Sequence, residues 1–174
     1  MGDRVRVLFV CLGNICRSPT AQGVFENLVK EAGLGDQIVI DSAGTGDWHL
    51  GKAPDQRARQ AAQGKGVEIG HLRARQVSAK DFGGYDYILA MDRSNLTDLE
   101  HMKPDWYLGH LGLFLPFAPQ SRYEQIDEVP DPYYGGFDTF ERVYELIHQA
   151  SLGLLDHIRQ HHLRGQGQRG QSHD

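Results

Sequence analysis

VRVLFVCLGNICRSP, residues 5–19, is the stretch that decides the fold. The β-branched and aromatic residues of Val5–Val10 predict a short buried strand, and the glycine that follows predicts a turn. Ser18 is expected to cap a helix that begins at Pro19, because the first helical residue needs no N–H and proline has none. The stretch therefore predicts a strand, a tight turn and a helix in direct succession.

The turn holds two reactive side chains, Cys11 and Arg17. The backbone N–H groups at a helix N-terminus have no partners within the helix, and the helix dipole adds partial positive charge there. Such a place binds phosphate and stabilises a thiolate, which is a competent nucleophile. The planar guanidinium of Arg17 can bind two phosphate oxygens at once. We therefore expect an enzyme that attacks a phosphate group with the sulfur of Cys11.

The rest of the turn is expected to bind the same phosphate. Its N–H groups would form an anion-binding concavity, and Gly13 and Asn14 are the residues best able to adopt the positive φ that a tight curl demands. The hydroxyl of Ser18 is expected to donate to the thiolate or to the departing phosphate. The expected phosphate-binding residues are Leu12, Gly13, Asn14, Ile15, Cys16, Arg17 and Ser18.

Apolar runs and helical periodicity alternate along the rest of the chain. The predicted strands are 5–10, 37–41, 85–90 and 111–115, and the predicted helices are 19–32, 55–64, 92–102 and 137–161. This alternation predicts an α/β fold, a single doubly wound, flavodoxin-like (Rossmann-like) domain with a four-stranded parallel sheet and helices on both faces. The domain is expected to span residues 1–162. The Gly-, Gln- and Arg-rich residues 163–174 are expected to form a disordered tail.

Composition argues against several classes of protein. The 174 residues include 18 Lys and Arg against 23 Asp and Glu, and this net charge of −5 argues against nucleic-acid binding. No apolar segment is long enough to cross a bilayer and the N-terminus lacks the pattern of a signal peptide, so we expect no membrane association. Two cysteines within one turn do not suggest a structural disulfide, which favours a cytoplasmic location. The C-terminal histidines have no packed scaffold, so no metal and no cofactor are expected.

Several further motifs accompany the turn, and together they resemble a known family. Residues 10–19 closely resemble the signature loop of the low-molecular-weight protein tyrosine phosphatases. The other matching motifs follow in that family's order, and they are Asp41–Thr45, Trp48, His71–Gln76, Met91–Asn95 and Asp131–Tyr134. The resemblance covers roughly residues 4–158, and a set of ordered motifs is far more specific than one loop.

Asp131 lies between two prolines, where turn-forming residues by themselves are equally consistent with an ordinary turn. The resemblance implies that Asp131 is the general acid, which protonates the leaving oxygen and then activates water. It also implies that large side chains form the walls of a cleft around a flat phosphorylated ring, and that polar side chains support the loop through hydrogen bonds. The implied walls are Leu12, Trp48, Tyr133 and Tyr134, and the implied supports are Asn14, Ser42 and His71.

The resemblance implies that the substrate is a phosphotyrosine protein or peptide, or a small aryl phosphate. Protein-arginine phosphatases, the main alternative, typically have threonine in place of Ile15 and phenylalanine in place of the Tyr133–Tyr134 pair. Arsenate reductases of the same fold need two further cysteines, which this chain lacks. A thiol-redox protein would be expected to contain C-x-x-C, and an inactive phosphopeptide-binding module would lack the nucleophile or the acid. We also expect inhibition by phosphate-like oxyanions and a monomeric protein.

Two further residues receive roles from their surroundings. Cys16 is expected to be the redox partner of Cys11, because a second thiol can convert an oxidised cysteine into a reversible disulfide. The alternative is that Cys16 only packs beneath the loop, as many free cysteines do. Asp92 is expected to cap a helix and to have no catalytic role.

Overall fold

The computed structural model describes residues 4–119 and 125–163. Four parallel strands form one sheet in the order β2-β1-β3-β4. The strands are β1 (Val5–Cys11), β2 (Ile38–Gly44), β3 (Tyr87–Ala90) and β4 (His110–Leu113). The chain leaves β1 toward β2 on one side and later adds β3 on the other, so the direction of winding reverses at β1. Ligands bind such sheets where the strand order reverses, at the carboxyl ends of the strands.

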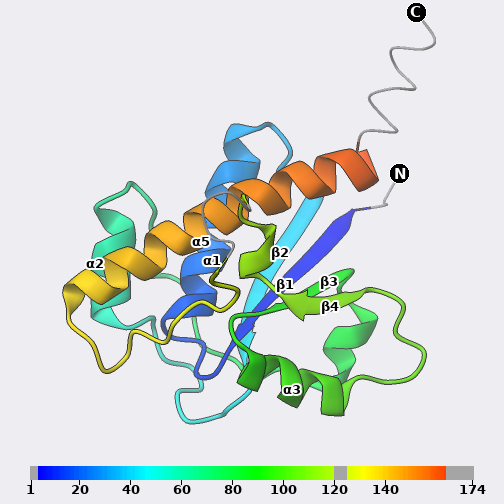
Figure 1. Cartoon of the computed structure of the whole chain (residues 1–174), viewed down its shortest axis with the longest axis horizontal. Helices are drawn as coiled ribbons and strands as arrows, with labels where there is room; N and C mark the ends of the chain where they lie inside the picture. Colours follow the sequence, from blue (N-terminus) through cyan, green and yellow to red (C-terminus); the bar gives the residue numbers. More distant parts are fainter. Residues whose placement is uncertain (1–3, 120–124, 164–174) are drawn as a thin grey trace, which may run out of the picture.

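Helices cover both faces of the sheet (Figure 1). They are α1 (Arg17–Glu31), α2 (Gln56–Gln63), α3 (Arg93–Met102) and α5 (Phe137–Ile158), with short 3-10 turns at Ala79–Gly83 and Leu115–Phe117 and a π-helical turn at Arg159–Leu163. The helices α1, α2 and α5 pack together on one face, and α3 packs against β3 and β4. Among the described residues, no helix is both long and apolar enough to span a membrane.

Strand β1 is buried on both faces, which explains its continuous apolar run. Phe9 points into the larger core, where its ring meets those of Phe25 and Phe114 edge to face at 5.8 and 4.9 Å between centroids. Leu8 and Val10 point into the smaller core on the α3 side. Packing on both faces fixes the carboxyl end of β1, which is the end that presents Cys11.

The α/β fold and its eight predicted elements are confirmed, but several boundaries differ. The first helix begins at Arg17 with Cys16 as its N-cap residue, so the prediction that Ser18 is the N-cap and Pro19 the first helical residue is wrong. The hydroxyl of Ser18 is engaged by Cys11 and Asn14 instead, and it does not cap the backbone. A helix can therefore begin without a side-chain cap where the polar side chain is held by tertiary contacts.

Strand β2 runs three residues further than predicted because its last residue, Gly44, pairs with Cys11. A side chain could not fit there, since a Cβ on Gly44 would lie 2.7 Å from the carbonyl oxygen of Leu12. Strand β4 spans His110–Leu113. Of the last two predicted residues, Phe114 still donates its N–H to the carbonyl of Ala90 in β3, and Leu115 begins the next 3-10 turn. The last predicted helix ends at Ile158 and continues as the π-helical turn. Residues 164–174 of the predicted tail lie outside the described residues.

Candidate active site

The loop of residues 11–18, called the Cys11 loop below, joins β1 to α1. Asn14 has a φ of 56°, the only positive φ of a non-glycine residue in the described chain, whereas Gly13, the other candidate, does not have a positive φ. Three carbonyl oxygens of the loop accept N–H groups from outside it: Cys11 from Thr45, Leu12 from Gly46, and Ile15 from Asp55, at 2.8–2.9 Å. With its carbonyl groups tied to the surrounding protein, the loop can direct N–H groups toward a bound anion.

The sulfur of Cys11 is buried and receives two polar contacts. The backbone N–H of Asn14 donates to Sγ at 3.3 Å, and the hydroxyl of Ser18 lies 3.0 Å from it. Both groups can donate to a negatively charged sulfur, and the start of α1 adds its dipole. Donors of this kind fit a sulfur that acts as a nucleophile.

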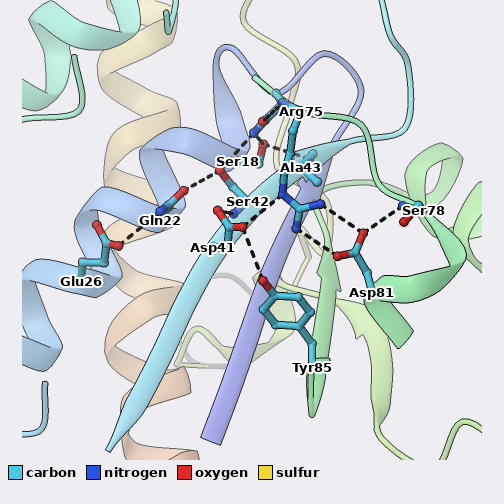
Figure 2. Close-up of polar contacts among 11 residues, drawn as sticks. Ser18, Gln22, Glu26, Asp41, Ser42, Ala43, Arg75, Ser78, Asp81 and Tyr85 are labelled. Carbon is cyan, nitrogen blue, oxygen red and sulfur yellow. Dashed lines mark hydrogen bonds and ion pairs between the residues drawn. The ribbon is translucent and has the colours of Figure 1, made fainter. Parts of the chain in front are cut away.

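The side chain of Asn14 ties the Cys11 loop to β2. Its amide nitrogen donates to Ser18 Oγ at 2.7 Å and to Ser42 Oγ at 3.0 Å, while its oxygen accepts the backbone N–H of Arg75 at 3.0 Å. Ser42 in turn donates to Gln22 Oε1 at 2.6 Å. Figure 2 shows the contact between Ser42 and Gln22. Together these buried hydrogen bonds hold Asn14 in its left-handed backbone conformation.

Arg17 is a buried cation with two carboxylates beside it. Its Nη1 donates to Asp92 Oδ2 at 2.7 Å and to the carbonyl of Val129 at 2.9 Å, and its Nη2 lies 3.7 Å from Asp131 Oδ2. Burial alone would lower the pKa of Arg17, but the nearby Cys11 and the hydrogen bond to Asp92 raise it above its ordinary value. The guanidinium therefore stays charged next to the nucleophile, where it can bind phosphate oxygens.

Asp92 does more than the sequence predicts. Its Oδ1 accepts the N–H of Asn95 at 2.8 Å, which is the expected cap of α3, while its Oδ2 binds Arg17. The capping role was the only one that sequence spacing could suggest, because the partner lies 75 positions away. Asp92 thus helps to fix the orientation of the Arg17 guanidinium.

A cleft of about 420 Å³ opens above the Cys11 loop. Asp131 reaches it with a side chain that is 41% exposed, and its Oδ1 accepts the N–H of Tyr133 at 3.0 Å. The cleft is lined by Cys11, Leu12, Gly13, Ile15, Cys16, Arg17, Trp48, His49, Asp131, Tyr133 and Tyr134. Trp48 and Tyr134 are largely exposed, so much of their ring surface is free to contact a ligand. The structure thus brings the predicted nucleophile, arginine, acid and aromatic walls together around one cavity.

Two histidines differ from the expectations based on sequence. His71 is exposed and makes no hydrogen bond with any described residue. The expected hydrogen bond from His71 to the Cys11 loop is therefore absent. The backbone N–H of Arg75 binds Asn14 instead, while the Arg75 side chain forms ion pairs with Asp41 and Asp81 (Figure 2). His49 lines the cleft but was missed, because a histidine after an exposed tryptophan gives no sequence signal.

Cys16 is also buried, and burial is the main cause that raises the pKa of its thiol. Cys11 and Cys16 are both free thiols. Within residues 4–119 and 125–163, no cluster of three or more His, Cys, Asp or Glu side chains could hold a metal ion.

Comparison with known proteins places this arrangement in a family. The family described as low molecular weight phosphotyrosine protein phosphatase matches residues 6–164. The chain belongs to this family. A Schizosaccharomyces pombe low molecular weight phosphotyrosine protein phosphatase is 46% identical to it over 159 residues, which cover 91% of this chain and 99% of that protein.

Solved structures of relatives have the same fold. YfkJ from Bacillus subtilis has a TM-score of 0.84 and 38% identity, over 92% of this chain and 98% of that one. A protein tyrosine phosphatase from Entamoeba histolytica, crystallised with Hepes in the active site, also has a TM-score of 0.84, with 35% identity over 90% of this chain and 97% of that one.

We predict that Asn14→Ala lowers kcat/KM for 4-nitrophenyl phosphate by about 10²-fold, because small misplacements of catalytic groups have effects of this size. The substitution removes three hydrogen bonds and puts alanine at a positive φ, which costs about 1–2 kcal/mol. Asn14→Gly is the matched control, since glycine accepts the φ but not the hydrogen bonds, and its kcat/KM should lie between. Parent-like activity of the glycine variant would show that the hydrogen bonds are dispensable.

Proposed function

We propose that this chain hydrolyses phosphotyrosine and aryl phosphate monoesters through a phosphocysteine intermediate. The observation that supports this function best is the convergence of Cys11, Arg17 and Asp131 on one cleft at the carboxyl end of β1. The family of the chain supports the same function, since its relatives are described as tyrosine phosphatases.

In the first step the thiolate of Cys11 attacks phosphorus, while Asp131 donates a proton to the departing phenolic oxygen. Charge spreads over the three non-reacting phosphoryl oxygens in the transition state, so Arg17 and the N–H groups of the Cys11 loop stabilise it. In the second step Asp131, now ionised, takes a proton from water, which attacks phosphorus and releases Cys11. Ser18 donates to the sulfur as it leaves.

The cleft favours an aromatic phosphate ester. Trp48, Tyr133 and Tyr134 provide ring faces and edges around the opening, and aromatic pairs contribute stabilisation beyond area burial. Ile15 presents an apolar side chain to the cleft and has no hydroxyl that could position water. Phosphate-like oxyanions should compete for the Cys11 loop, and the Hepes in the active site of the Entamoeba histolytica relative carries a sulfonate of this kind.

Side-by-side hydrolysis of three peptides tests the substrate class. The peptides share one sequence and present phosphotyrosine, phosphoarginine or phosphoserine, and kcat/KM is measured by phosphate release. We expect phosphotyrosine to be preferred by about tenfold or more, within the range that pocket contacts can discriminate. Cys11→Ser should abolish turnover of all three. A preference for phosphoarginine would contradict the proposed substrate, and turnover by Cys11→Ser would contradict the mechanism.

Replacement of the general acid tests the second catalytic role. Asp131→Asn should lower kcat for a phosphotyrosine peptide by about 10²–10⁴-fold, the usual contribution of general acid–base catalysis. Mass spectrometry after acid quench should detect a phosphate on Cys11 in parent and variant alike. Asp138→Asn, an exposed change in the first turn of α5, is the matched control and should leave kcat unchanged. Loss of less than tenfold in Asp131→Asn would remove this residue from the mechanism.

We further propose that Cys16 protects Cys11 from irreversible oxidation. Burial raises the pKa of Cys16, so this residue remains a thiol at neutral pH and peroxide reacts with the Cys11 thiolate first. Peroxide converts the thiolate to a sulfenic acid, and the Cys16 thiol displaces the hydroxyl, forming a disulfide and one water.

Recovery of activity after peroxide tests this protection. The parent should regain most of its activity with a dithiol reductant, whereas Cys16→Ala should not, because its Cys11 proceeds to the sulfinic acid. Mass spectrometry of the Cys11 peptide distinguishes the two oxidised products. Equal recovery of parent and variant would leave Cys16 with a packing role only.

A further inference from the structure

Arg57, the second residue of α2, reaches across to the loop that contains Asp131. Its Nη2 donates to the carbonyl oxygen of Tyr133 at 3.0 Å, and its Nη1 donates to that of Gly135 at 3.1 Å. The guanidinium thus binds two peptide groups within four residues of Asp131. The mechanism above assigns no role to this arginine.

The same guanidinium is joined to the Cys11 loop through Asp55. Its Nε and Nη2 bind the two carboxylate oxygens of Asp55 at 3.1 and 3.0 Å. The backbone N–H of Asp55 donates to the carbonyl of Ile15 at 2.8 Å. Burial would raise the pKa of the Asp55 carboxyl, but the hydrogen bonds from Arg57 outweigh it and lower the pKa, so the pair stays ionic. Arg57 also lies 4.4 Å from the centroid of Phe140 in α5, a cation–π contact.

Asp131 has few restraints of its own. Its side chain is 41% exposed, and among the described residues its polar partners are the N–H of Tyr133 and, at 3.7 Å, Arg17. The carbonyl of the same Tyr133 is one of the two that Arg57 binds. The N–H that binds the Asp131 carboxylate and the carbonyl that binds Arg57 thus both belong to Tyr133. Through Arg57 and Asp55, Tyr133 is therefore attached to the Cys11 loop.

We propose that Arg57 is a positioning residue that holds Asp131 where it can protonate the leaving oxygen. This proposal rests on the proposed phosphatase function. Arg57 does not line the cleft, and it acts through the hydrogen bonds of its planar guanidinium. A lysine has the same charge but cannot bind a carboxylate with two parallel hydrogen bonds while also reaching two carbonyls. Arg57→Lys should therefore resemble Arg57→Met.

The test measures kcat/KM across aryl phosphates whose leaving phenols range from 4-nitrophenol, which departs readily, to tyrosine, which departs poorly. Protonation by Asp131 matters most for the poor leaving groups. In Arg57→Met the loss should grow from less than about threefold for 4-nitrophenyl phosphate to about 30-fold for a phosphotyrosine peptide, part of the 10²–10⁴-fold that a general acid provides. Arg59→Met is the matched control, since Arg59 is exposed on the same helix and its guanidinium lies against Gly70. It should leave the whole series unchanged.

A double-mutant cycle separates positioning from a general structural effect. In the Asp131→Asn background there is no acid to position, so Arg57→Met should add no further dependence on the leaving group. Equal loss for every phenol would overturn the proposal, because misfolding lowers all rates alike. So would a leaving-group dependence that persists in the Asp131→Asn background. A parent that hydrolyses no aryl phosphate would instead overturn the proposed function, on which this role depends.

Discussion

The architecture of this site depends on one buried cation. Arg17 must lie beside the sulfur of Cys11 to bind the oxygens of a phosphate, yet an unpaired buried charge is strongly destabilising. The chain meets this constraint with Asp92 from the start of α3, the carbonyl of Val129, and Asp131. Two segments far apart in sequence, at Asp92 and at residues 129–131, therefore converge on one guanidinium, and the proposed general acid, Asp131, belongs to the second of them.

The local field explains how an anionic protein can favour an anionic substrate. The chain has a net charge of −5, so long-range attraction cannot supply the affinity. The attraction is confined to Arg17 and the N–H groups at the start of α1, where low dielectric strengthens it. Before a phosphate enters, Asp92 and Asp131 balance the positive charge of Arg17. A bound phosphate would compete with Asp131 for the guanidinium, and in the proposed mechanism Asp131 donates its proton to the leaving oxygen.

Sequence reasoning succeeded where one residue type has few alternative uses. The apolar run before Cys11 predicted a short buried strand, which the structure buries on both faces, and Cys11, Arg17 and Asp131 meet at one cleft. It failed where a side chain acts at a distance: Ser18 faces the sulfur and leaves the helix start uncapped, while the backbone of Arg75 contacts Asn14 where a hydrogen bond from His71 was expected. Backbone donors leave no trace in residue identity, so no pattern could have revealed that contact.

The position of the loop that contains Asp131 is also set by contacts that sequence patterns do not reveal. Its residue types predict a turn, and a turn by itself leaves an exposed carboxylate free to sample many positions. Val129 and Pro132 are buried on either side of Asp131, but Tyr134 is 93% exposed, so apolar packing holds only part of this loop. Hydrogen bonds restrain the more exposed part, and Arg57 in α2 provides two of them, to the carbonyls of Tyr133 and Gly135. In an open cleft, we therefore infer, the proposed acid is positioned by groups such as Arg57 that do not line the cleft.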